Sequence, residues 1–242
     1  MLRAVLRVAG LILLFLACLP PHLLSKLLLG RSPWPRRFLA AAAWIVGARV
    51  RVVGEPLRPH TLLLVNHLSW LDILALGGAT GCAFVSKDNL GHGFIHWLAD
   101  QNQTLYIHRG RRSATADQAS AIAAALQLPQ PLALFPEGTT GPGDHLLPFR
   151  SSLLAAVAPA PPRSHVRPVA LDYGPAAREI GWYGESGRDN VLRVLGRKGT
   201  LSTTLHLLPP LERSDDRKLL AHRTREAIET TLAASSSARA GL

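Results

Sequence analysis

The sequence has few of the residues that mark several common classes of protein. It holds two cysteines in 242 residues, Cys18 and Cys82, and neither lies in a CxxC or Cys/His pattern. A disulfide scaffold and a cysteine-based metal site are therefore excluded. Only 18% of the residues are charged and 48% are hydrophobic, which excludes a disordered chain. The length suits one domain with a substantial core.

Acidic residues are nearly absent from the N-terminal quarter of the chain. Residues 1–60 contain nine basic residues and one acid, Glu55, whereas the remaining chain has 18 basic and 15 acidic residues. The basic residues flank blocks of leucine, alanine and valine, and not the polar and aromatic residues typical of a nucleic-acid surface. This distribution favours contact with an anionic lipid surface and predicts no nucleic-acid partner.

No uninterrupted apolar run reaches the roughly 20 residues that a membrane-spanning helix needs. Residues 8–19 form one run, which stops at Pro20-Pro21, and residues 38–48 form a second after a basic, proline-containing break over residues 30–37. We predict that residues 1–48 form a basic, apolar helical arm that anchors the chain. Two short helices in one leaflet are one arrangement, and a span over residues 2–29, which would include charged residues and prolines, is the other. A cleaved signal peptide is the alternative, because Arg3 and Arg7 precede an apolar run of allowed length.

From residue 49 onward, short apolar segments alternate with helical patterns, which predicts an α/β fold. One domain is expected over residues 49–233, followed by a flexible tail over residues 234–242. A helix from residue 71 should end at Gly77-Gly78, and a final helix should run from a cap at Ser214 to about Leu232. Strands are predicted at residues 50–53, 62–65, 83–86, 105–107, 132–135, 166–171 and 200–207, and further helices at residues 116–128 and 151–158.

The segment VNHLSWLD, residues 65–72, lies where a predicted strand ends and a helix begins, a common place for α/β active sites. Because His67 precedes the helix, the chain can fold back so that Asp72 meets the imidazole. Asp72 would then hold one ring nitrogen protonated and leave the other free as a base. Alternatively, Ser69 and Asp72 form a capping box with a purely structural role.

A second candidate segment is FPEGTT, residues 135–140. Glu137 followed by Gly138 and Thr139 at a strand end offers a fixed acceptor and exposed backbone N–H groups. Such an arrangement can hold a hydroxyl-bearing substrate or a phosphate. Taken alone, it is also consistent with a loop that carries a helix-capping glutamate. The histidines at positions 92, 96 and 108 do not form a helical HxxxH, so no metal site is predicted.

Together these segments resemble the glycerolipid acyltransferases, the 1-acylglycerol-3-phosphate acyltransferase-like family. Residues 67–72 match its HxxxxD motif and residues 135–139 its FPEGT motif, while residues 105–109 and 167–171 resemble its intermediate and closing blocks. The resemblance covers about residues 50–172. It implies a mixed central sheet flanked by helices, and an enzyme whose lysolipid hydroxyl attacks an acyl thioester of coenzyme A or acyl carrier protein.

The resemblance also implies roles for individual residues. His67 would act as the base that removes the hydroxyl proton, and Asp72 would orient it. Arg109 and Lys87 would face the acceptor phosphate, while Glu137, Gly138 and Thr139 would position the acceptor. No metal or bound cofactor is expected, since the acyl thioester is a substrate. A cytosolic donor would place the site on the cytoplasmic side of a bacterial inner membrane.

The acceptor remains open at this stage. Many phosphatidic-acid-forming members carry arginine after EGT, where this chain has Thr140. The leading expectation is 1-acylglycerol-3-phosphate, which would give phosphatidic acid. The alternative is a lyso-ornithine lipid, because residues 135–154 and the IGWYG segment resemble the lyso-ornithine-lipid acyltransferases. A third possibility, from another class, is a non-catalytic lipid-binding protein in which HxxxxD is structural.

Overall fold

Within the part of the chain that the structure describes, seven strands form one sheet. The computed structural model describes residues 1–87, 93–107 and 114–241, and at 87, 114–119 and 156 it describes the backbone alone. Of the pairings described, β6 with β7 is antiparallel and the others are parallel, so the sheet is mixed, as predicted. The strands lie in the order β1 (Ala48–Gly54), β7 (Leu201–Leu207), β6 (His165–Asp172), β2 (Thr61–Val65), β5 (Leu132–Leu134), β3 (Ala83–Lys87) and β4 (Leu105–Ile107).

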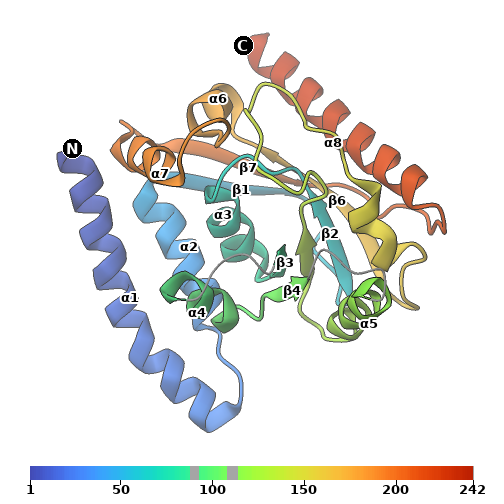
Figure 1. Cartoon of the computed structure of the whole chain (residues 1–242). Helices are drawn as coiled ribbons and strands as arrows, with labels where there is room; N and C mark the ends of the chain where they lie inside the picture. Colours follow the sequence, from blue (N-terminus) through green and yellow to red (C-terminus); the bar gives the residue numbers. More distant parts are fainter. Residues whose placement is uncertain (88–92, 108–113, 242) are drawn as a thin grey trace.

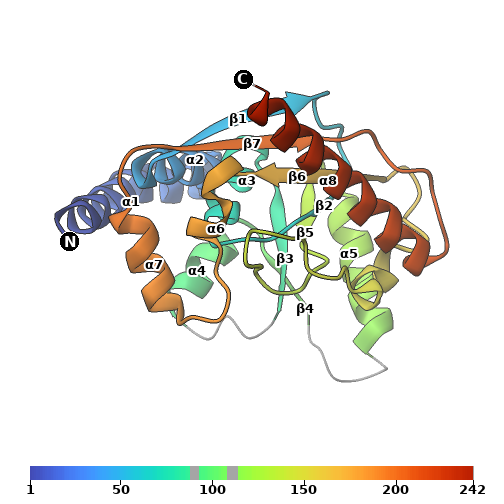
Figure 2. The ribbon, with the colours of Figure 1, turned by 90° about the horizontal axis from the view of Figure 1, so that it is seen from above.

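Helices cover both faces of this sheet (Figure 1 and Figure 2). Leu63 and Val65 of β2 pack in the cluster with α2 (Trp34–Val46) and α3 (Leu71–Thr80). Leu62 and Leu64 point the other way, into the cluster with α5 (Ala114–Leu126) and α8 (Arg217–Ala240). Strand β2 is therefore buried on both sides, as expected for a central parallel strand. The remaining elements are α1 (Leu2–Leu29), α4 (Phe94–Gln101), a 3₁₀ helix (Ser151–Val157), a second 3₁₀ helix (Gly174–Ala176), α6 (Ala177–Ile180) and α7 (Gly187–Gly196).

The two candidate segments leave the sheet side by side. Strands β2 and β5 are parallel neighbours, with Leu64 opposite Leu134. Asn66 and Phe135 therefore follow the carboxyl ends of adjacent strands at the same edge. In parallel sheets this edge is where binding sites are usually built. The fold thus brings the HxxxxD and FPEGT segments together, although about 65 residues separate them in the sequence.

The N-terminal arm consists of α1 and α2, which lie side by side (Figure 1). Helix α1 is long and apolar enough to cross a membrane, by length and composition. Many of its large apolar side chains are exposed, including Leu13, Leu16 and Leu27. The Arg7 guanidinium donates to the carbonyls of Val194 and Leu195 at the end of α7, where a helix dipole favours a cation. The exposed apolar surface suggests membrane association.

Pro20-Pro21 interrupts the apolar run but does not end the helix, because α1 continues to Leu29, where the basic break begins. Proline holds φ at a helical value, so the pair removes hydrogen bonds without forcing the chain to turn. Contacts on both sides of the prolines hold the helix in place. Phe15 packs edge-on against Phe94 at 5.1 Å, and the ring of His22 is bonded to Ser32 and Gln101.

The end of α3 also differs from prediction, because Gly77 and Gly78 lie within the helix, which continues to Thr80. Helix α2 packs so closely here that a Cβ on Gly78 would come within 2.6 Å of the Ala40 backbone. These glycines permit close helix packing and do not end the helix.

The predicted flexible tail over residues 234–242 is also wrong for residues 234–240. Helix α8 begins after an Asp216 cap, instead of Ser214, and continues to Ala240. Beyond the predicted end at Leu232, Ser235 and Arg239 both donate to Asp172 Oδ2 at the end of β6. This buried acceptor holds the last turns of the helix against the sheet.

Candidate active site

The turn that carries His67 begins with a buried side chain that ties it to the sheet. Asn66 follows β2, and its amide exchanges two hydrogen bonds with the backbone of Leu171 in β6, at 3.0 and 2.7 Å. Asn66 is fully buried. Its paired bonds extend the β2–β6 contact by one residue, so the position of the next residue, His67, is fixed by the sheet.

His67 and Asp72 are in contact, as the sequence predicted. The distance from His67 Nδ1 to Asp72 Oδ2 is 2.8 Å, and Asp72 has no exposed surface. The same oxygen accepts the N–H groups of Leu68 and Ser69, at 2.6 and 2.9 Å. Asp72 therefore orients the imidazole and also caps the turn. The alternative capping box is only half formed: Asp72 accepts the Ser69 N–H, but the Ser69 hydroxyl accepts a long 3.4 Å contact from the Leu71 N–H instead of a bond from the Asp72 N–H.

A residue that sequence reasoning missed completes this arrangement. Tyr173, at the end of β6, donates its hydroxyl to Asp72 Oδ1 at 2.6 Å. The tyrosine is buried, and burial raises its pKa well above the ordinary value, so it remains a donor. Together the bonds occupy both oxygens of Asp72. No local pattern marks Tyr173, because only the parallel pairing of β2 with β6 brings it to Asp72.

The structure places Glu137 differently from the acceptor-positioning role expected of it. Its carboxyl is 2% exposed and accepts the N–H of His67 at 2.8 Å and the N–H of Leu147 at 3.0 Å. Burial raises the pKa of Glu137 to about 7, and the two backbone N–H groups oppose this rise. Glu137 thus lies behind the His67 turn and holds its backbone. Gly138 and Thr139 do line the cavity in front of the turn.

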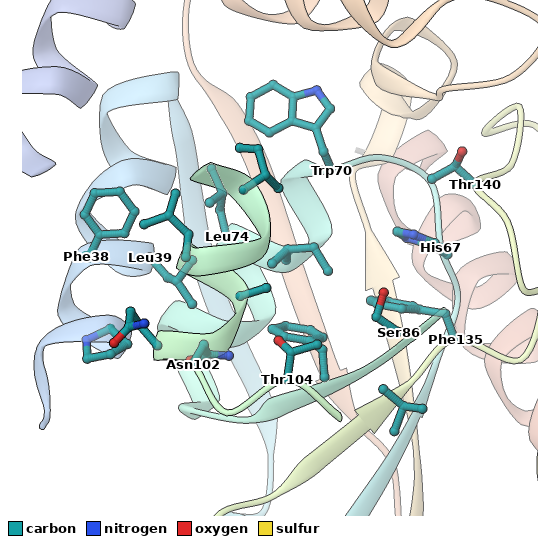
Figure 3. Close-up of a pocket in the computed structure, with 18 of the residues that line it drawn as sticks. Phe38, Leu39, His67, Trp70, Leu74, Ser86, Asn102, Thr104, Phe135 and Thr140 are labelled. Atoms are coloured by element: carbon teal, nitrogen blue, oxygen red, sulfur yellow. The ribbon is translucent and has the colours of Figure 1, made fainter. Parts of the chain in front are cut away.

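A large apolar cavity of about 1,010 Å³ opens in front of His67. The imidazole stacks on Phe135 at 4.0 Å between ring centroids and is 18% exposed. Figure 3 shows His67 and Phe135 at one end of the cavity, with Phe38 and Leu39 of the arm at the other. The arm therefore supplies one wall of the cavity. Because Nδ1 is bonded to Asp72, Nε2 is the nitrogen left for a molecule in this space.

Two loops meet at the His67 end of the cavity. Gly141 N–H donates to the carbonyl of His67, and Trp182 N–H donates to the carbonyl of Leu68, both at 2.8 Å. The Thr140 hydroxyl then donates to the carbonyl of Trp182 at 2.6 Å. Thr140, the residue after EGT, thus supplies a hydroxyl that links the two loops. The IGWYG segment is part of the site.

Chemically, this is a buried carboxylate, an oriented imidazole and an apolar space that admits a hydrocarbon chain. A neutral imidazole nitrogen in such a place can take a proton from a hydroxyl group. The family model described as Acyltransferase matches residues 49–172. The chain belongs to the acyltransferase family. The resemblance drawn from the four sequence blocks is thereby confirmed, and the protein is an enzyme of lipid metabolism.

Two relatives illustrate the range of this family. The lyso-ornithine lipid O-acyltransferase of Rhodobacter capsulatus is 31% identical over 249 residues, covering 94% of this acyltransferase and 89% of that protein. The 1-acyl-sn-glycerol-3-phosphate acyltransferase of Neisseria gonorrhoeae is 33% identical over 138 residues, covering 55% and 52%. The acyltransferase therefore spans nearly the whole of the first relative and about half of the second.

A solved structure confirms the predicted fold. The 1-acyl-sn-glycerophosphate acyltransferase PlsC of Thermotoga maritima matches with a TM-score of 0.63 at 18% identity, covering 82% of this acyltransferase and 76% of that chain. At this identity the likeness concerns the fold, a mixed sheet flanked by helices. Of the remaining predicted site residues, Arg109 lies outside the described residues. Lys87 ends β3, at the edge of the sheet where the site is built.

Proposed function

We propose that this acyltransferase moves a fatty acyl group from a thioester to the hydroxyl of a lyso-ornithine lipid. The observation that carries the proposal is the His67–Asp72 pair, whose free imidazole nitrogen is at the end of a cavity with mainly apolar walls. A non-catalytic lipid-binding protein would not need an imidazole at this point, because Asp72 alone caps the turn.

In the proposed reaction, the oxygen of the acceptor hydroxyl attacks the thioester carbonyl while His67 Nε2 takes the hydroxyl proton. The new ester C–O bond forms, the C–S bond breaks, and the leaving thiolate receives the proton. A free imidazole has a pKa of ~6.5 and an ordinary thiol of about 8.5, so both transfers suit neutral pH. No covalent intermediate on the protein is needed. Acyl-CoA or acyl carrier protein is the expected donor.

Three observations favour the lyso-ornithine acceptor. The relative matched over almost its whole length acts on that lipid by name, and Thr140 stands where many phosphatidic-acid-forming members carry arginine. In addition, no lysine or arginine is found among the described side chains that line the cavity. The second candidate is 1-acylglycerol-3-phosphate, which the Neisseria relative supports and which Arg109 and Lys87 would bind.

The arm suits an enzyme whose acceptor arrives from a membrane. Its helices wall the cavity and carry the exposed apolar surface. Arg37 lies over the Trp34 ring at 4.9 Å, and Arg49 over the Trp44 ring at 4.8 Å. Such tryptophan–arginine pairs suit a lipid headgroup layer. We place the site on the cytoplasmic side, since acyl thioesters are cytosolic.

An acceptor panel tests the proposal. The full chain in lipid nanodiscs is given lyso-ornithine lipid or lysophosphatidic acid, each with acyl-CoA and with acyl carrier protein as donor. We expect kcat/KM for lyso-ornithine lipid to exceed that for lysophosphatidic acid by about tenfold or more, because one missing charged contact is worth about that factor. A reversed preference would establish 1-acylglycerol-3-phosphate as the acceptor. If no lysolipid is acylated, the proposed acyltransferase activity is wrong.

A Tyr173→Phe variant tests the third member of the hydrogen-bonded chain. Removing the hydroxyl leaves Asp72 Oδ1 without its 2.6 Å partner while the ring keeps its packing. We expect kcat for acyl transfer to fall by about three- to tenfold with little change in KM, as one buried hydrogen bond to a charged group predicts. Tyr106→Phe is the matched control, since that hydroxyl bonds Asp100, away from His67. Equal activity of the two variants would show that Tyr173 only packs.

A further inference from the structure

The mainly apolar wall of the cavity contains a carboxylate, that of Glu185. Among the described residues that line the cavity, Glu185 is the one aspartate, glutamate, lysine or arginine. It ends the loop of residues 181–185, whose Trp182 is bonded to Leu68 and to Thr140. Hydrogen bonds through Asn190 also connect Glu185 to the site. The Asn190 amide accepts a 3.1 Å bond from the Trp70 indole and donates to Glu185 Oε1. Trp70 and Thr140 flank the His67 end of the cavity (Figure 3).

The Glu185 carboxylate is held in place with half of its bonding capacity unused. Oε1 accepts the amide of Asn190 at 2.8 Å and the guanidinium of Arg193. Within the described part of the chain, Oε2 takes no hydrogen bond. The side chain is 25% exposed. The Asn190 amide, followed by Arg193, holds the pKa of Glu185 below its ordinary value, so the group is charged at neutral pH. An ordered anion with a free oxygen thus belongs to a residue that lines the cavity.

We propose that Glu185 binds the ammonium group of an amine-bearing acceptor lipid, and so selects acceptors by head group. This inference rests on the proposed function and names the head-group contact for it. A carboxylate with a free oxygen forms a charge-assisted bond with a primary ammonium. A phosphate monoester cannot accept a bond from the free carboxylate oxygen, and the neighbouring Arg193 already donates to Glu185 Oε1 and to the Gly181 carbonyl. The contact therefore favours the ammonium.

The chemistry of the lipid agrees with the position of Glu185. In a lyso-ornithine lipid, the reacting hydroxyl is on an amide-linked acyl chain, and nine bonds separate its oxygen from the terminal nitrogen. In an extended chain three bonds span about 3.5 Å, so the nine bonds place the ammonium roughly 10 Å from the reacting oxygen. In lysophosphatidic acid the phosphorus is only four bonds from the reacting oxygen. Recognition at Glu185, whose loop is bonded through Trp182 to Leu68 beside His67, thus suits the longer head group.

The test combines a change in the protein with a change in the lipid. Glu185→Gln keeps the acceptor for Asn190 and Arg193 but removes the charge, and δ-N-acetylation of lyso-ornithine lipid removes the ammonium. We expect each change alone to lower kcat/KM by about tenfold, and both together to lower it little further. Turnover of lysophosphatidic acid should stay equal or rise. Glu179→Gln is the matched control, because Glu179 pairs with Arg197 at 2.7 Å outside the cavity wall.

Each other outcome overturns the proposal in a distinct way. If Glu185→Gln lowers the turnover of both acceptors equally, or if the two changes multiply independently, Glu185 only supports its loop. If the variant matches the wild type on lyso-ornithine lipid, the ammonium binds elsewhere. If the wild type fails to acylate lyso-ornithine lipid at all, the proposed function falls and this inference falls with it. Turnover without dependence on the ammonium overturns the inference alone.

Discussion

Replacing His67 by alanine should lower kcat for acyl transfer by about 10²–10⁴-fold, the range expected for loss of a general base. The imidazole is held between Asp72 and the Phe135 ring, with Nε2 left for the substrate. No other described imidazole near the turn can replace it, because His22, also in the cavity wall, is bonded through both ring nitrogens. Steady-state rates with acyl-CoA and lyso-ornithine lipid provide the measurement.

Stability should change little in the same variant. The His67 side chain is partly exposed. The bonds that the His67 backbone makes, its N–H to Glu137 and its carbonyl to the Gly141 N–H, do not depend on the imidazole. His222→Ala is the matched control, since His222 is an exposed α8 residue that faces Glu226. Thermal denaturation of all three proteins shows whether the fold is kept. A His67→Ala protein with near-wild-type turnover would leave HxxxxD with a structural role only.

Asp72→Asn should lower kcat by about 10²-fold or more. An asparagine oxygen can still accept the N–H groups of His67, Leu68 and Ser69, so the turn keeps much of its geometry. It cannot supply the negative charge that stabilises an imidazolium as the proton arrives. The amide nitrogen also replaces the acceptor of the Tyr173 hydroxyl. We therefore expect the free energy of unfolding to fall by about 1–3 kcal/mol, the cost of disturbing one buried polar group.

Comparing the loss of kcat with the loss of unfolding free energy shows whether Asp72 acts in catalysis or only caps the helix. Rates and chemical denaturation are measured on the same preparation, with Asp144→Asn as the control. Asp144 also pairs with a histidine, His145, but on the surface. If Asp72→Asn unfolds the protein while His67→Ala remains active, Asp72 serves the helix alone. If both variants fold and both are inactive, the pair acts on the substrate.

Local sequence predicted the parts of the site that a short stretch of chain can build. His67 and Asp72 are five residues apart across a strand-to-helix turn, and such a turn has few ways to close. The alternation of apolar and helical segments likewise predicted the sheet, including β4 at Leu105–Ile107. Boundaries were less accurate where the sequence contained a helix breaker. Pro20-Pro21 and Gly77-Gly78 lie inside helices because neighbouring helices hold them there.

By itself, the sequence determined the family, the α/β fold and the residues that bear the proposed chemistry, because these depend on local pattern and motif. Tertiary structure alone decided which groups surround them. Tyr173 meets Asp72 only through the parallel pairing of β2 with β6, and Glu137 turns behind His67 because β5 lies beside β2. The place of Glu185 in the cavity wall depends on the bonds that join its loop to Leu68, Thr140 and Asn190. Such contacts join residues distant in the chain, and no local preference encodes them.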